Sequence, residues 1–367
     1  MSRRIARWAV PAGVVAVLAG SVVLVPVVAG ADPSLPERSA AELLAEVGEA
    51  QAQPFSGTVV ETADLGFPAL PSSGDSPNLS DLVTGSNTAR IWYASPDKAR
   101  VALLGTLAET DVIRNGNDVW VWTSDKNTAQ HYLLPSDDAD ESTEAPAPSV
   151  VTPSEAAEQA LEAVDPTTHI TVDGTSEVAG RPVYELVLAP RDERSLIGQV
   201  RLAVDADTSM PLRVQVYAAG ATEPAFETGF TSVSFTTPDD SVFAFSPPPG
   251  AEVEENVLAE KTSPRRDVVP DDVRGEDEPT IIGEGWTSVA VLKGVDVADL
   301  TAGSDRRNGA AQTLLQALSP VSGAYGSGRL LTTDLVSALL LDDGRLLVGA
   351  VPPSVLEEVA VDPRAGG

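Results

Sequence analysis

From residue 88 to residue 236 the chain alternates short β-prone segments with turn residues, and this pattern constrains the fold more than any other feature. The Asn115-Gly116 pair is the strongest short-range signal for a tight β-hairpin. Strands that follow one another at such short intervals predict an antiparallel meander and not a sheet of βαβ units. The expected strands are 90–93, 100–104, 110–114, 118–122, 128–134, 168–173, 182–189, 198–205, 211–218 and 224–236.

Two helices interrupt or precede this meander. Ser39 and Glu42 have the spacing of a capping box, in which each side chain satisfies a backbone N–H of the first helical turn. They predict a helix over 39–52, which Pro54 ends. Thr152 and Glu155 predict a second helix over 152–164 by the same signal. The Gly-, Pro- and Ser-rich residues 63–88 predict a long loop, and loops of this length in a domain are usually functional or mobile.

The N-terminus has the features of an export signal. Three arginines precede an uncharged stretch over residues 8–31, which ends in Ala29-Gly30-Ala31, a small-residue cleavage motif. The stretch is also long enough to span a bilayer. The sequence leaves both possibilities open: a cleaved signal peptide, or a transmembrane anchor with a cytoplasmic N-terminus. In either case residues 32–367 are expected outside the cytoplasm.

Changes in composition divide the chain into four parts. We expect an export segment over 1–31, a large domain over 32–250, an acidic flexible linker over 251–279 and a small α+β domain over 280–362. The expected elements of the small domain are strands 285–292, 329–333, 336–341 and 345–351, and helices 308–318 and 353–359.

Composition excludes several functions. Without cysteine there can be no disulfide, thiolate metal site or thiol nucleophile. A net charge of −30 argues against a nucleic-acid partner, because phosphate binding needs a basic surface. No nucleophile elbow, phosphate loop or metal-ligand spacing occurs, so we predict no catalytic residue, metal or cofactor. Hydrolysis by a pair of carboxylates stays open, although no pair stands out.

The two histidines, His131 and His169, are both expected on strands. A histidine beside carboxylates can act as a pH-sensitive contact near neutral pH. The simpler interpretation for both is a half-exposed strand residue.

Several predicted strands are apolar on both faces, so the sheet needs cover on both faces. The sheet can curl around the helices and leave an apolar cleft, the usual form of a ligand site, or it can enclose a filled core. If a cavity exists, we expect it to be lined by aromatic and aliphatic strand residues, although the pattern does not decide which face looks inward. The candidates are Phe55, Trp92, Trp120, Trp122, Tyr184, Val214 and Phe230.

The order of export signal, helix, meander, helix and second meander resembles the LolA/RseB-type family of periplasmic lipoprotein carriers and their actinobacterial relatives. The resemblance covers about residues 36–250. The segments that carry it are 66–71, 90–101, 115–122 and 204–216, the last with a strand, an Asp-containing turn, Pro211-Leu212-Arg213 and another strand.

The resemblance implies an α+β fold: an incomplete antiparallel β-barrel, closed on one side by helices, whose apolar cavity holds acyl chains. It implies a non-enzymatic extracytoplasmic protein that binds lipid or lipoprotein acyl chains, with the helix 39–52 and the loop 63–88 as the lid. The alternative is an RseB-like envelope-stress regulator that binds a membrane protein. The tail after residue 281 favours it weakly, through Gly285-Trp286 and the hairpin over 336–351.

Overall fold

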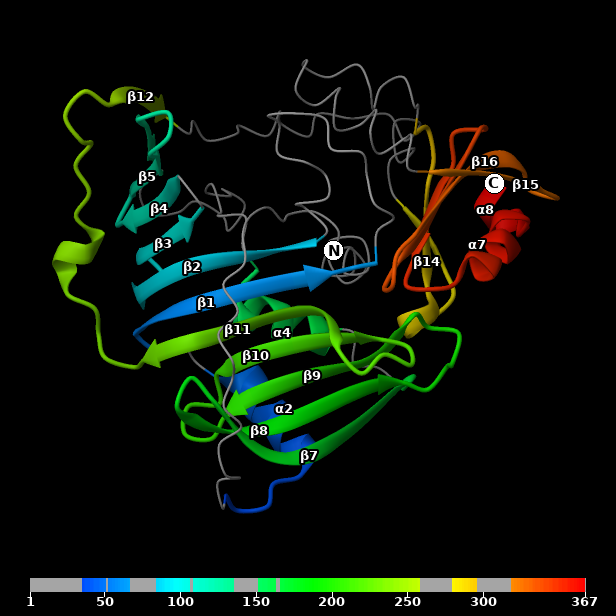
Figure 1. Ribbon diagram of the computed structural model, residues 1–367, viewed down its shortest axis with the longest axis horizontal. Helices are drawn as coiled ribbons and strands as arrows, with labels where there is room; N and C mark the ends of the chain where they lie inside the picture. The colour runs from blue at the N-terminus through cyan, green and yellow to red at the C-terminus, as the bar shows by residue number, and fades with distance from the viewer. Residues whose placement is uncertain are drawn as a thin grey trace, which may run out of the picture.

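The computed structural model describes residues 35–50, 52–66, 84–105, 108–134, 151–162, 166–257, 279–295 and 318–366. Its largest element is a twelve-stranded sheet. Its strands follow the order β12-β6-β5-β4-β3-β2-β1-β11-β10-β9-β8-β7 (Figure 1). The bounds are β1 (Phe55–Asp64), β2 (Thr84–Ser95), β3 (Lys98–Leu104), β4 (Glu109–Asn115), β5 (Asp118–Thr123), β6 (Thr128–Leu133), β7 (Thr168–Val178), β8 (Arg181–Pro190), β9 (Ile197–Asp205), β10 (Pro211–Ala218), β11 (Pro224–Ser234) and β12 (Glu252–Val257).

Neighbouring strands of this sheet pair in the antiparallel sense, except that β12 runs parallel to β6. The turn between β4 and β5 shows why the sequence folds this way. Asn115 pairs with Asp118, and Gly116 between them has φ of 64°, a left-handed conformation that glycine adopts without strain. The edge strands β7 and β12 do not pair with each other, so the barrel is incomplete.

Helices α2 (Ala40–Glu49) and α4 (Pro153–Glu162) lie together against one face of the sheet, behind β8–β11 in Figure 1. The side chain of Ser39 accepts a hydrogen bond from the N–H of Glu42 at 3.3 Å, and the Glu42 carboxylate accepts from the N–H of Ser39 at 2.8 Å. The predicted capping box is therefore formed.

After β11 the chain crosses the sheet toward β12, and we call residues 236–257 the strap. The strap contains a short 3-10 helix, η2 (Asp240–Phe243), whose Phe243 is buried. Arg100 on β3 donates a hydrogen bond to the carbonyl of Val242 at 3.3 Å, and Lys98 pairs with Asp240 at 2.9 Å. The strap is therefore fastened to the strands from β3 to β6.

A second sheet of six strands forms the C-terminal domain, in the order β13-β14-β18-β17-β16-β15. The fully buried Leu339, Leu347 and Leu356 form its core together with helix α7. The bounds are β13 (Thr280–Ile282), η4 (Gly285–Thr287), β14 (Val289–Leu292), β15 (Ser319–Gly323), β16 (Gly326–Thr332), β17 (Ser337–Leu341), β18 (Leu346–Gly349), α7 (Pro353–Ala360) and α8 (Pro363–Gly366).

The two domains are joined by direct contacts. The N–H of Asp334 donates to the carbonyl of Leu65 at 2.9 Å, and the N–H of Leu196 donates to the carbonyl of Ala350 at 2.8 Å. An apolar cluster between them combines residues of both domains: Ala63, Leu65, Ala225, Phe226, Leu335 and Val336. Backbone bonds together with buried apolar surface fix the small domain against the large sheet.

The predicted fold class is confirmed: a mostly antiparallel open sheet with few helices, followed by a small second sheet. The expected linker 251–279 begins with strand β12, because residues 252–257 pair with β6. The expected loop 63–88 is shortened at both ends by β1 and β2. The stretch 1–31, the loop core 67–83, the linker residues 258–278 and residues 308–317 of the helix expected over 308–318 lie outside the described residues.

Candidate functional site

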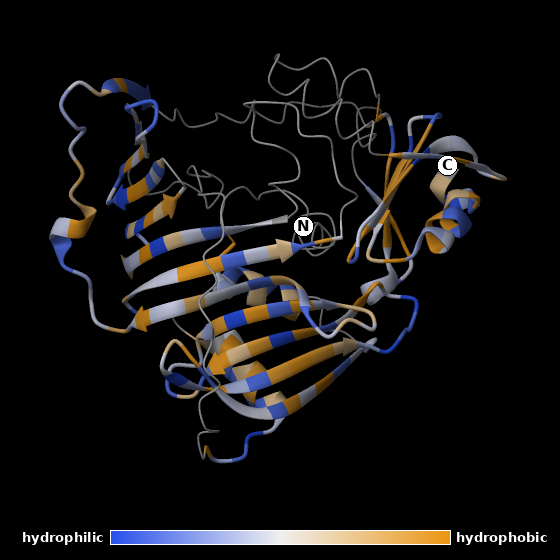
Figure 2. Cartoon of the chain, in the orientation of Figure 1, coloured by the Kyte–Doolittle hydropathy of each residue, from blue (hydrophilic) through white to orange (hydrophobic). Residues whose placement is uncertain are grey.

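The face of β8, β9 and β10 beneath the two helices is a continuous apolar surface. It is built from alternate residues, because side chains on a strand point to opposite faces in turn. Tyr184 pairs with Val204 and Leu186 with Leu202, so apolar residues stand beside one another across the strands. We call this the helix-covered face: Tyr184, Leu186, Leu188, Val200, Leu202, Val204 and Val214, all buried. Orange bands run along these strands in Figure 2.

Helices α2 and α4 cover this face with different side chains. Helix α2 inserts the fully buried Leu43, with Leu44 and Val47 half-buried beside it. Helix α4 contributes the small side chains of Ala156, Ala157 and Ala160. Burying a leucine side chain stabilises the fold by roughly 1.5–3 kcal/mol. The apolar contacts therefore account for most of the attachment of α2.

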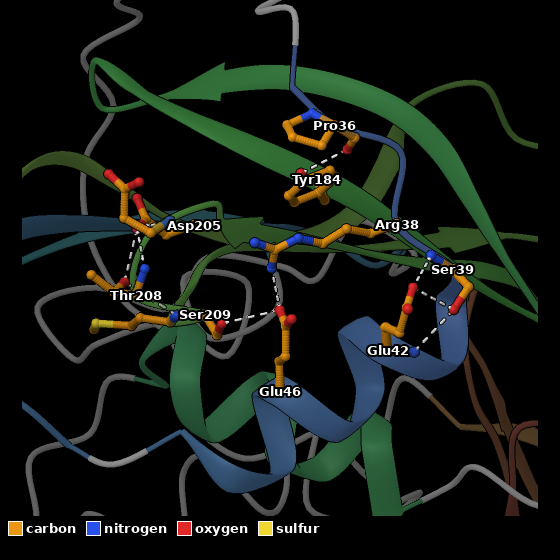
Figure 3. A network of polar contacts seen from close by, with 11 residues as sticks. Pro36, Arg38, Ser39, Glu42, Glu46, Tyr184, Asp205, Thr208 and Ser209 are labelled. Atoms are coloured by element: carbon orange, nitrogen blue, oxygen red, sulfur yellow. Dashed lines mark hydrogen bonds and ion pairs between the residues drawn. The ribbon is translucent and has the colours of Figure 1, made fainter.

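Few polar contacts fasten α2 (Figure 3). The Tyr184 hydroxyl donates to the carbonyl of Pro36, just before the helix, at 2.8 Å. Arg38 pairs with Glu46 within this segment, and its guanidinium lies 5.0 Å from the centre of the Tyr184 ring. Ser209, in the turn between β9 and β10, donates to Glu46 at 3.4 Å. These contacts join α2 to two points of the sheet and leave its position dependent on apolar packing.

A buried carboxylate fastens the start of α4. Glu61 on β1 is fully buried and accepts hydrogen bonds from the N–H of Val151 at 3.0 Å and from Asn87 Nδ2 at 3.2 Å. Thr228 donates to the carbonyl of Val151 at 2.8 Å, so both backbone polar atoms of Val151 are held. Burial raises the pKa of Glu61, the Glu155 carboxylate adds to the rise, and the two N–H donors oppose it.

The structure distributes the seven predicted lining residues over three places. Tyr184 and Val214 belong to the helix-covered face. Phe55 and Phe230 pack edge to face, with ring centres 5.8 Å apart, in a separate apolar cluster that includes Val59.

The three tryptophans among the seven lie on other strands, Trp92 on β2 and Trp120 and Trp122 on β5. Trp120 and Trp122 face the strap's Phe245, with ring centres 5.4 Å and 6.4 Å apart. Trp92 lies under the Arg100 guanidinium, 5.5 Å from its ring centre. The seven residues are therefore not brought together in one site.

Sequence reasoning missed two kinds of residue at the helix-covered face. The apolar alternation of β8 and β9 could have identified Leu186, Leu188 and Leu202, because they share the parity of Tyr184. No pattern marks Glu61, since a glutamate within an alternating strand is usually expected to face solvent.

The described residues contain no group of three or more histidine, aspartate or glutamate side chains placed to hold a metal ion. An open depression near the start of β7 is lined by Pro166, Thr167, Arg191, Asp192, Glu193 and Arg194. No helix within the described residues is both long enough and apolar enough to cross a membrane.

Residues 84–235 match the family model of the MucB/RseB N-terminal domain. This part of the chain is therefore similar to that domain. The predicted resemblance to the LolA/RseB type is thereby confirmed, and the match covers strands β2 to β11. No curated protein sequence matches the chain.

Solved structures of low sequence identity also resemble the chain. The Pseudomonas aeruginosa MucA/MucB complex has 18 % identity and a TM-score of 0.43, covering 88 % of this chain and 97 % of the other. MucB bound to MucA(peri) has 18 % identity and a TM-score of 0.42, with the same coverage. A LolA-superfamily protein from Nitrosomonas europaea has 12 % identity and a TM-score of 0.21, covering 57 % and 99 %.

Proposed function

We propose that this MucB/RseB-type chain is a non-enzymatic, extracytoplasmic protein that binds the acyl chains of a lipid or lipoprotein. The observation that carries the proposal is the helix-covered face, a buried apolar surface whose cover is two ten-residue helices. Helices of this length are marginal on their own in water, so they depend on the sheet for their structure. An acyl chain offers the sheet the same kind of apolar contact.

In this proposal α2 acts as the lid. When it moves away, the face formed by β8, β9 and β10 becomes available, and hydrophobic burial of ~25 cal/mol per Å² drives binding. The predicted lining residues Phe55, Trp92, Trp120, Trp122 and Phe230 remain part of the proposal as contacts of a longer ligand. The basic and apolar start of the chain supports export, either through a cleaved signal or with the N-terminus kept as an anchor.

Uptake of a fluorescent fatty acid tests the proposal with a matched pair of variants. Val214 lies on the helix-covered face, and Val187 lies on the opposite face of β8, two strands away, because it alternates with Leu186 and Leu188. A valine-to-threonine change is close to isosteric and adds one hydroxyl. Val214→Thr should weaken uptake several-fold, and Val187→Thr should not. Equal effects of the two variants, or no uptake by the unmodified protein, would contradict the proposal.

A second candidate function is regulation through a membrane protein partner. The MucB/RseB family match and the presence of a second domain, docked through Leu65 and Leu196, favour it. Pull-down from the envelope of the host cell should then recover a protein in stoichiometric amount. Recovery of lipid without a protein partner would count against this function and leave the first one in place.

A further inference from the structure

The end of the strap is held by a histidine placed between two carboxylates. His131 lies on β6, with Asp118 on the neighbouring β5 and Glu255 on β12. Its Nε2 is 2.7 Å from a carboxylate oxygen of Asp118, and its Nδ1 is 2.8 Å from one of Glu255. The imidazole also stacks on Trp120, with ring centres 4.2 Å apart and planes at 11°. One side chain therefore connects three strands.

This geometry requires a protonated ring. A neutral imidazole has one N–H donor and one acceptor nitrogen, whereas ionised carboxylates only accept hydrogen bonds. Both contacts of His131 can be hydrogen bonds only when both ring nitrogens carry a proton. Loss of the proton breaks one contact and removes the positive charge from between Asp118 and Glu255.

The surroundings favour the protonated form. Partial burial lowers the pKa of His131, but hydrogen bonding and charge attraction from Glu255 and Asp118 outweigh it, so the pKa is raised above its usual value. Trp120 is uncharged, and Asp118 and Glu255 are the charged groups that act on His131 from β5 and β12. A group with a raised pKa stabilises the folded contact at low pH and loses that effect as pH rises through the raised value.

We propose that His131, when protonated, holds strand β12 on the edge of the large sheet, and with it the downstream half of the strap. Strand β12 pairs on one side only, with β6, and Gln130 on β6 donates a hydrogen bond to Glu254 at 2.8 Å. Its Glu252, Glu254 and Glu255 are exposed, so β12 is attached mainly by this pairing and by the contact of Glu255 with His131. Loss of the proton near or above neutral pH loosens β12 and frees the edge of β6. The upstream half stays fastened by Arg100 and the buried Phe243.

Hydrogen exchange across about pH 5 to 9 tests the proposal on the full-length protein. After correction for intrinsic rates, exchange of β12 should rise with pH above the pKa of His131, by at most about tenfold per pH unit because one proton is involved. His131→Gln should keep β12 at the fast-exchange level at every pH. The chain offers a matched control in its other histidine, the exposed His169 on β7. His169→Gln should behave like the unmodified protein.

A second variant keeps the test valid if His131→Gln misfolds. Glu255 is 70 % exposed, so Glu255→Gln leaves the core intact. It should lower the pKa of His131, read from an NMR titration of the two histidines, and move the loosening of β12 to lower pH by the same amount. The proposal is overturned if β12 keeps its protection while His131 titrates, or if His131→Gln retains the pH dependence of the unmodified protein. Neither result bears on acyl-chain binding.

Discussion

Replacement of Leu43 by alanine should release helix α2 from the sheet. Leu43 is 0 % exposed and packs on the helix-covered face. Alanine lacks three of its carbon groups, and at ~0.8 kcal/mol each their loss costs ~2.4 kcal/mol before any cavity forms. Because about 1.4 kcal/mol corresponds to a factor of ten in an equilibrium, the open fraction of α2 should rise about fiftyfold.

Hydrogen exchange measured by mass spectrometry can follow this opening directly. Exchange of residues 40–49 should accelerate about fiftyfold, by the conversion above, while β17 in the other domain is unchanged. Val361→Ala is the matched control, because this valine is 52 % exposed and its truncation removes no buried contact. If exchange in α2 is unaffected, or if α2 and β17 accelerate together, then α2 is not a separately opening lid and the reasoning fails.

Three further substitutions test other contacts. Because the pKa of Glu61 is raised in the folded protein, the free energy of unfolding falls as the pH rises from about 4.5 through this raised pKa. Glu61→Gln should make the free energy of unfolding depend less on pH in this range, which urea unfolding at several pH values measures. Asp205, whose pKa is lowered by Arg181 and the Thr208 donors despite its burial, stabilises the fold above its ordinary pKa and loses that effect in acid. Asp205→Asn should therefore cost about 1.5–3 kcal/mol at neutral pH and weaken the acid transition. Gly66→Ala should loosen the domain contact, seen as faster proteolysis, because φ is +64° and the new Cβ would lie 2.5 Å from the Asp334 carboxylate.

Local sequence signals predicted the elements that depend on neighbours in the chain. The Asn115-Gly116 turn and the Ser39–Glu42 capping box form as expected, because each needs only a few adjacent residues. Strand alternation likewise predicted the antiparallel meander. The family resemblance then supplied the open barrel and its helical cover, which local patterns do not determine.

Long-range contacts were beyond such reasoning. Strand β12 was expected in a linker because of its acidic composition, yet it pairs in parallel with β6, more than a hundred residues earlier. Glu61 gives no signal, since its partner Val151 is distant in sequence. The seven predicted lining residues are all apolar or aromatic, but Trp120 and Trp122 pack against Phe245 of the strap and not on the helix-covered face.

Native mass spectrometry of the protein purified from its own host most directly tests the claim that the helix-covered face binds acyl chains. We expect an added mass that dissociates as an acyl lipid and that is reduced in Val214→Thr but kept in Val187→Thr. A protein that always carries no added mass, and that also fails to take up a fluorescent fatty acid after Leu43→Ala opens α2, would contradict it.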